Sequence, residues 1–174
     1  MQKVAVIIAN GTEEIEVLTP VDILRRAGVD CDLVSVSGEY PTCSHAVTIK
    51  ADKTVDQVDF NNYSAIVIPG GMPGAINIAN NEKVVDGIRY LLDSGKIVAS
   101  ICASPAVVLG AHGFVKNKKV TCYPANDFIA VLKDSVYTAK DVEVDGNIIT
   151  ANGPKSALKF SLAICESLGV VPKF

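Results

Sequence analysis

The chain has 174 residues, the size of one ordinary domain, and its 49% hydrophobic and 20% charged residues are typical of a compact α/β protein. Its net charge of -3 argues against nucleic-acid binding, which needs a basic face, and its apolar N-terminal stretch is too short to span a membrane. The five scattered cysteines fit a reducing compartment, so we expect a single cytoplasmic domain over residues 1–174.

Apolar runs and amphipathic segments alternate along the chain, which predicts strands followed by helices. The predicted strands cover residues 4–9, 31–37, 64–69, 97–101 and 119–122, and residues 43–50 are expected to be extended. The predicted helices cover residues 13–27, 81–94, 104–111 and 154–168, with Thr12 and Ser104 as N-caps. Residues 142–150 are predicted to form a hairpin turning at Asp145-Gly146. This order predicts an α/β fold with a mostly parallel sheet and helices on both faces.

The predicted strand at residues 97–101 ends at Cys102, and Pro105 then opens a helix. Strand, reactive residue and helix in this order form the layout of a nucleophile elbow, although Ser100 and Ser104 stand where its signature has glycines. A helix N-terminus would favour the thiolate, which is the nucleophilic form of cysteine. The alternative is a buried and inert cysteine, because free cysteine is among the most buried residue types.

Two other predicted strands lead into residues suited to the same chemistry, namely Glu16 and the pair Gly70-Gly71. Because the carboxyl ends of parallel strands share one edge, we expect these residues beside Cys102. There, burial and a neighbouring negative charge would raise the pKa of Glu16, and its protonated form would donate a hydrogen bond to the thiolate. The glycine N–H groups would form an oxyanion hole. The alternatives are a solvated Glu16 at a helix start and an ordinary glycine turn.

Three further residues are candidates for the pocket. Tyr123 follows a predicted strand end and could line it, and the segment at Asn152 could supply N–H donors to an anion or serve only as a cap. His45 could reach the pocket of a neighbouring chain or lie on the surface. Neither histidine of the sequence has a partner at metal-ligand spacing, so we expect no metal site.

Four segments occur together: Ala-Asn-Gly-Thr-Glu-Glu-Ile-Glu at 9–16, Val-Ile-Pro-Gly-Gly at 67–71, Ala-Ser-Ile-Cys-Ala-Ser-Pro at 99–105 and Asn-Gly-Pro at 152–154. In this order and spacing they resemble the ThiJ/PfpI superfamily, most closely the branch of the parkinsonism-associated deglycase. The resemblance implies a flavodoxin-like three-layer sandwich and a homodimer. It also implies an oxidation-sensitive Cys102, a hydrogen-bonded Glu16, oxyanion donors at Gly70, Gly71 and Ala103, and a second redox-active cysteine at Cys43.

The chain departs from this superfamily at several positions. Ala103 replaces the histidine of protease-like members, so a cysteine peptidase would lack its base. Tyr123 stands where many members of the deglycase branch carry histidine. Asn152 stands where relatives often have arginine, and His45 replaces another basic residue, so anion binding at the pocket mouth is expected to be weaker.

The resemblance implies an enzyme that acts on small reactive aldehydes, methylglyoxal or glyoxal, without glutathione, metal or other cofactor. Cys102 would add to the aldehyde, and Glu16 would move a proton between adjacent carbons. The same pocket could release early glycation adducts as a deglycase. The alternative is an oxidation sensor and chaperone without turnover, and a cysteine peptidase ranks third. The expected partners are the aldehyde or glycated substrate and a second copy of the chain, with no nucleic acid or membrane.

Overall fold

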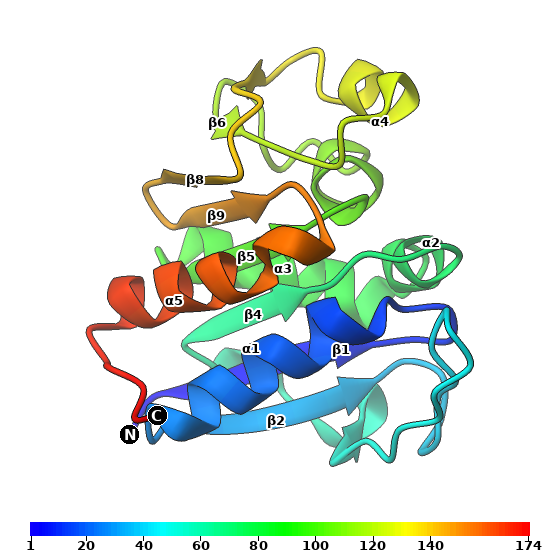
Figure 1. The fold of residues 1–174 in the computed structure, drawn as a ribbon, viewed down its shortest axis with the longest axis vertical. Helices are drawn as coiled ribbons and strands as arrows, with labels where there is room; N and C mark the ends of the chain where they lie inside the picture. The colour runs from blue at the N-terminus through cyan, green and yellow to red at the C-terminus, as the bar shows by residue number, and fades with distance from the viewer.

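A seven-stranded sheet forms the middle layer of the molecule (Figure 1). The computed structural model describes residues 1–174, and the strands follow the order β3-β2-β1-β4-β5-β9-β8. All neighbouring strands are parallel except β8 and β9. The bounds are β1 Lys3–Ile8, β2 Asp30–Ser35, β3 Lys53–Thr54, β4 Ala65–Ile68, β5 Ile97–Ile101, β8 Val142–Asp145 and β9 Ile148–Ala151. Two further strands, β6 (Lys119–Val120) and β7 (Val136–Tyr137), pair in a small sheet of their own.

Helices cover both faces of this sheet. The helices α1 (Glu14–Arg26) and α5 (Ala157–Leu168) lie side by side on one face (Figure 1). The opposite face carries α2 (Gly74–Ala79), α3 (Glu82–Asp93) and the π-type helix η3 (Pro105–Gly110), and α4 (Asn126–Val131) packs against η3. Short 3-10 turns are η1 (Val55–Gln57), η2 (Phe60–Asn62) and η4 (Pro154–Ser156). This arrangement confirms the predicted flavodoxin-like three-layer sandwich. None of these helices combines the length and apolar character needed to cross a bilayer.

The sheet separates two apolar clusters of 23 buried residues each. Along β1, Val4, Val6 and Ile8 pack into the cluster under α1 and α5, whereas Ala5 and Ile7 pack into the other. Successive side chains of a strand point to opposite faces, so a strand buried on both faces must be apolar at every position. The continuous apolar runs of the sequence therefore indicate the central strands.

The structure corrects several predicted elements. The N-cap of α1 is Glu13, which accepts from the N–H of Glu16, whereas Thr12 accepts from the N–H of Ala9. Residues 43–50 form no strand, because only one bridge joins Thr42 to Thr48. The strand predicted at 119–122 is shorter and lies outside the main sheet. The helix after Cys102 is π-type, and Ser104 does not cap it. The hairpin at 142–150 is confirmed as the antiparallel pair β8 and β9.

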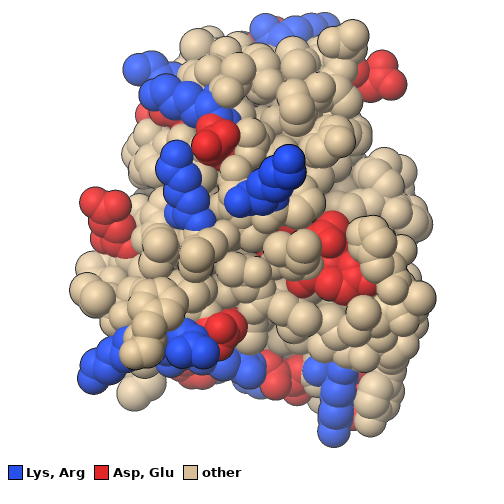
Figure 2. Space-filling model, in the orientation of Figure 1, with Lys and Arg blue, Asp and Glu red and all other residues tan.

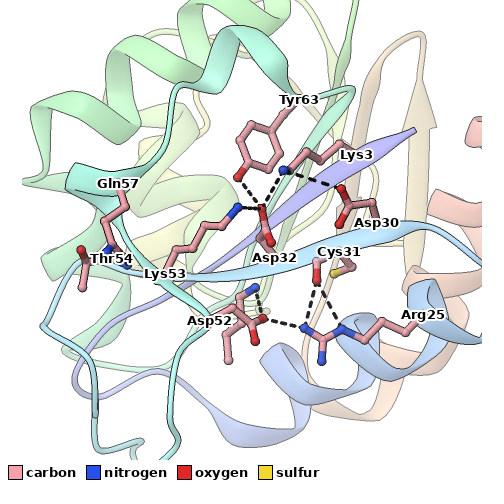
Figure 3. Close-up of polar contacts among 11 residues, drawn as sticks. Lys3, Arg25, Asp30, Cys31, Asp32, Asp52, Lys53, Thr54, Gln57 and Tyr63 are labelled. Atoms are coloured by element: carbon pink, nitrogen blue, oxygen red, sulfur yellow. Dashed lines mark hydrogen bonds and ion pairs between the residues drawn. The ribbon is translucent and has the colours of Figure 1, made fainter. Parts of the chain in front are cut away.

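A polar network lies at the amino ends of β1 and β4 (Figure 3). Asp32 is buried and accepts from the hydroxyl of Tyr63 at 2.6 Å and from Nζ of Lys53 at 2.9 Å, while Nζ of Lys3 lies 3.3 Å away. Burial acts to raise the pKa of Asp32, but these partners outweigh it and lower that pKa. The network is at the opposite edge of the sheet from Cys102, so we assign it to stability.

Candidate active site

The carboxyl ends of β1, β4 and β5 lie side by side, because these strands are neighbours and run parallel. The loops that follow them are joined by a 3.1 Å hydrogen bond from the N–H of Glu13 to the carbonyl oxygen of Gly70. Figure 2 shows acidic side chains gathered beside the N-terminal end of α1 on this face. The structure brings together the predicted site residues Glu16, Gly70, Gly71, Cys102 and Ala103.

Cys102 adopts a left-handed backbone conformation, with φ of +66°. Such a conformation costs a residue with a side chain about 1–3 kcal/mol, so its surroundings must maintain it. The N–H of Cys102 donates to the carbonyl oxygen of Ala151 at 2.9 Å, and its own carbonyl accepts from the N–H of Tyr123 at 2.7 Å. The hydroxyl of Ser104 donates to the carbonyl oxygen of Pro69 and ties the turn to β4. The turn has the form of a nucleophile elbow, and Cys102 is half-buried, whereas the other four cysteines are buried.

Glu16 is fully buried and lies next to the sulfur of Cys102. Its Oε2 accepts a 2.8 Å hydrogen bond from the N–H of Gly70, while Oε1 is buried without a partner. Burial raises the pKa of Glu16 to about 7, against the opposing effect of its hydrogen bonds with Cys102 and Gly70. The burial of Glu16 excludes the alternative of a solvated side chain that only stabilises the start of the helix. The side chain is therefore a carboxyl that gains and loses a proton near neutral pH.

The acidity of Cys102 differs from the sequence prediction. Burial, followed by the negative charge of Glu16 and the hydrogen bond with it, raises the pKa of the Cys102 thiol to about 12. The N–H groups of Gly71 and Ala103 act in the opposite direction. The prediction of a thiolate favoured by the helix was wrong, because burial beside a carboxylate outweighs these donors. Cys102 and Glu16 are coupled, and the first ionisation of the pair near neutral pH places the negative charge on the Glu16 carboxylate while the thiol keeps its proton.

The two glycines after β4 have different roles. A Cβ at Gly70 would lie 2.6 Å from Cβ of Cys102 and 2.8 Å from Oε2 of Glu16, so only glycine fits between them. Its N–H is already donated to Glu16, which corrects the prediction that Gly70 supplies an oxyanion donor. Gly71 has φ of +84° and directs its N–H toward the sulfur, as Ala103 does. The available oxyanion donors are therefore those of Gly71 and Ala103.

A hollow of about 660 Å³ adjoins this site, and both Tyr123 and Asn152 line it. The N–H of Asn152 donates to the carbonyl oxygen of Asp141 at 3.0 Å, so it is not free for an anion as the sequence suggested. Its side chain is also partnered, because Nδ2 donates to Oδ1 of Asp141 at 3.2 Å and Oδ1 accepts from Ser156 at 2.6 Å. Glu16 and Cys102 do not line this hollow themselves.

The contacts of His45 and Cys43 do not include the sulfur of Cys102. The imidazole Nδ1 of His45 lies 3.0 Å from Oε2 of Glu14 and 3.7 Å from Oε1 of Glu13. These side chains place three ligand atoms within 4.8 Å of one another, which the sequence spacing did not indicate. Cys43 is only 4% exposed, which argues against a second redox-active cysteine because an oxidant must reach the sulfur.

Sequence reasoning missed two residues that position the site. Glu13 caps α1 by accepting from the N–H of Glu16 at 3.0 Å and so fixes the turn that carries this carboxyl. The spacing of three residues between them is that of a helix cap and could have indicated this role. Ser104 was expected to cap a helix, but its bond to Pro69 joins positions 35 residues apart and has no local signal.

Comparison with known proteins identifies the family. The model of the DJ-1/PfpI family matches residues 2–167. The chain belongs to this family. Protein DJ-1 homolog B of Arabidopsis thaliana is 38% identical over 165 residues, which cover 94% of this chain but 37% of the plant protein. Protein dj-1beta of Drosophila melanogaster is 37% identical over 164 residues, which cover 94% of this chain and 87% of the fly protein.

Solved structures of the DJ-1/PfpI family have the same fold. Oxidized Toxoplasma gondii DJ-1 matches with a TM-score of 0.92 at 38% identity, over 97% of this chain and 91% of that protein. Drosophila melanogaster DJ-1beta matches with a TM-score of 0.90 at 36% identity, over 96% of this chain and 90% of the fly chain. These likenesses confirm the resemblance seen in the four sequence segments.

Proposed function

We propose that this DJ-1/PfpI protein converts small α-oxoaldehydes such as methylglyoxal into 2-hydroxy acids, through a covalent bond to Cys102. One observation carries the proposal: a buried Glu16 with a pKa of about 7 lies beside the half-buried sulfur. A general base is most effective when its pKa lies near the working pH. A carboxylate of ordinary acidity is a weaker base and would remove a proton from sulfur or carbon less readily.

The first step is addition of sulfur to the aldehyde carbon. Cys102 passes its proton to the Glu16 carboxylate, the sulfur–carbon bond forms, and the π electron pair of the carbonyl moves to its oxygen. The N–H groups of Gly71 and Ala103, which face the sulfur, stabilise this oxyanion. The oxyanion then takes the proton held by Glu16, which gives a neutral hemithioacetal and restores the carboxylate.

The second step is an isomerisation. Glu16 removes the proton from the former aldehyde carbon and returns it to the adjacent carbon, while the hydroxyl proton moves from one oxygen to the other. The hemithioacetal thereby becomes its isomer, the thioester of a 2-hydroxy acid, with no external oxidant or reductant. Water then cleaves the sulfur–carbon bond, releasing the acid and the Cys102 thiol. Release of glycation adducts as a deglycase would use the same covalent step.

Initial rates of lactate formation from methylglyoxal, without glutathione and with a metal chelator present, test the proposal. We expect Cys102→Ser and Glu16→Gln each to lower kcat/KM at least about a hundredfold, because each removes a group required in the transition state. Cys43→Ala is the matched control, since it removes a buried thiol whose contacts lie outside the site. Turnover by Cys102→Ser at the wild-type rate would overturn the proposal.

A second function, oxidation sensing with chaperone activity, is favoured by the exposure of one cysteine alone. Cys102 is half-buried, the other four cysteines are buried, and the Toxoplasma gondii relative is described as oxidized. Each oxidation step would transfer one oxygen atom from peroxide to the sulfur and release water. Intact-mass measurement after mild peroxide should show two added oxygens on Cys102. Their appearance without any methylglyoxal turnover would favour the sensor over the enzyme.

The proposed assembly is a homodimer. Apolar side chains are exposed along α1 and α5, namely Ile15, Leu18, Leu158 and Leu162, and a second copy would cover them. Light scattering should give twice the chain mass, and a monomeric mass would contradict the dimer. We also propose a cytoplasmic location, which the five free cysteines support and cell fractionation tests.

A further inference from the structure

The hollow of about 660 Å³ borders the backbone of Cys102 on two sides. One wall begins at Tyr123, whose N–H donates to the carbonyl oxygen of Cys102 at 2.7 Å. The other wall begins at Asn152 and Gly153, which follow Ala151, the acceptor for the N–H of Cys102 at 2.9 Å. The hollow therefore lies beside the turn that carries the Cys102 sulfur. Its volume lies in the range of small-molecule sites, about 300–1,000 Å³, and exceeds what methylglyoxal needs.

The ring of Tyr123 forms an apolar wall of this hollow. It is 45% exposed, which leaves one side open to a ligand. It packs against Phe128, whose ring meets it edge-on at 6.4 Å between centroids. A Cβ at Gly153 would make an ordinary van der Waals contact with the Tyr123 ring at 3.5 Å, so the ring lies close to this strand end. The rings of Pro124 and Pro154 extend the apolar lining.

Three polar side chains of the hollow, those of Ser156, Asn152 and Asp141, already satisfy one another, and Lys155 also lines it. The hydroxyl of Ser156 donates to Asn152, and the amide of Asn152 donates to Asp141. Asp141 is further paired with Nζ of Lys159, 3.7 Å from its Oδ2. An apolar group entering the hollow would thus leave none of these hydrogen bonds broken, which is the condition for burying it without penalty.

We propose that the hollow is a subsite for an aromatic substituent of larger α-oxoaldehydes and that Tyr123 determines this specificity. The inference rests on the proposed function and adds a substrate class to it. With the aldehyde carbon bonded to Cys102, the aryl group would lie against the exposed side of the Tyr123 ring. Offset or edge-on contact between the rings would favour it over a methyl group.

The turnover test compares phenylglyoxal with methylglyoxal as substrates. We expect the wild-type protein to show a higher kcat/KM for phenylglyoxal, and Tyr123→Ala to lower the ratio of the two values about tenfold, mainly through KM. Tyr123→Phe should keep the ratio, because the ring and not the hydroxyl makes the contact. Tyr90→Ala is the matched control, since Tyr90 is 38% exposed and lies outside the hollow. Cys102→Ser corrects for phenylglyoxal consumed by arginine side chains.

A second measurement needs no turnover. Alkylation of Cys102 by iodoacetamide or by its N-phenyl derivative forms a sulfur–carbon bond, expels iodide and releases the thiol proton. Relative to free cysteine, we expect the N-phenyl reagent to be favoured at Cys102 about tenfold, and Tyr123→Ala to abolish this preference. Equal preference in wild type and Tyr123→Ala, in either measurement, would overturn the subsite. Absence of all aldehyde turnover together with selective alkylation would refute the proposed enzyme while supporting the subsite.

Discussion

The N–H of Gly70 donates a 2.8 Å hydrogen bond to Oε2 of Glu16, across 54 positions of the sequence. This bond joins the loop after β4 to the first turn of α1, which follows β1. The carboxyl is therefore held by segments that follow two different strands. The absence of a side chain at Gly70 also gives Cys102 its place, because a Cβ there would lie 2.6 Å from the Cβ of Cys102.

We therefore predict that Gly70→Ala disables the site. The added methyl group must displace Cys102 or Glu16, which we expect to reduce methylglyoxal turnover at least about a hundredfold and stability by about 1–3 kcal/mol. Gly95→Ala is the control. Gly95 has φ of +68° in open space, so this variant should lose stability through backbone strain and keep full turnover. Equal turnover in both variants would contradict the assigned role of Gly70.

Glu16 is predicted to make stability depend on pH. Because its pKa is raised from 4.5 to about 7, the folded chain holds a proton that the unfolded chain has released between these values. The stability from this proton is fully present below pH 4.5 and is lost as the pH rises through 7, a change of about 3 kcal/mol. Denaturant unfolding of Glu16→Gln, which cannot titrate, should lack this component. Parallel stability curves for the two proteins would refute the buried carboxyl.

The turnover rate is predicted to depend on the same proton in the opposite sense. The proposed base is the Glu16 carboxylate, so kcat/KM for methylglyoxal should fall as the pH drops below about 7 and level off above it. Initial rates between pH 5 and pH 9, checked for folding by circular dichroism, measure the profile. A rate that stays constant down to pH 5 would show that the ionised carboxyl is not needed.

We predict that a substitution in the Asp32 network changes stability and leaves turnover unchanged. Tyr63→Phe removes the 2.6 Å hydrogen bond to the Asp32 carboxylate, and we expect a loss of about 1–2 kcal/mol in denaturant unfolding. Because the pKa of Asp32 is lowered, this stabilisation is present above pH 3.8 and should shrink as the pH falls below that value. Turnover should not change. Tyr40→Phe, at a tyrosine that is 58% exposed, is the control and should unfold like the wild type.

Local patterns predicted the fold well where an element is long and apolar on a regular period. β5 and its end at Cys102 follow directly from the run Ile97–Ile101. In contrast, β7 has two residues and α4 buries none, so neither carries a hydrophobic pattern that could be read. Residues 43–50 have strand-like composition, but they lack a second strand to pair with and form only the bridge at Thr42 and Thr48.

The residues of the site could be predicted from the sequence, but their pKa values could not. Glu16, Gly71 and Cys102 could be placed together because parallel strands end at one edge. The high pKa of the Cys102 thiol depends on burial and on Glu16, which lies 86 positions away, so no local feature reveals it. The meeting of His45 with Glu14 is likewise a contact across 31 positions.

The backbone sets the direction of the side chain at residue 102, through its left-handed φ and its hydrogen bonds to Ala151 and Tyr123. Whatever side chain occupies this position must therefore leave the chain in the same direction. A selenocysteine or a photoreactive amino acid introduced at 102 would leave the backbone on the side of Glu16, Gly71 and Ala103. A chemical probe introduced at this turn would therefore have a defined orientation, and it could report on bound molecules without redesign of the surrounding protein.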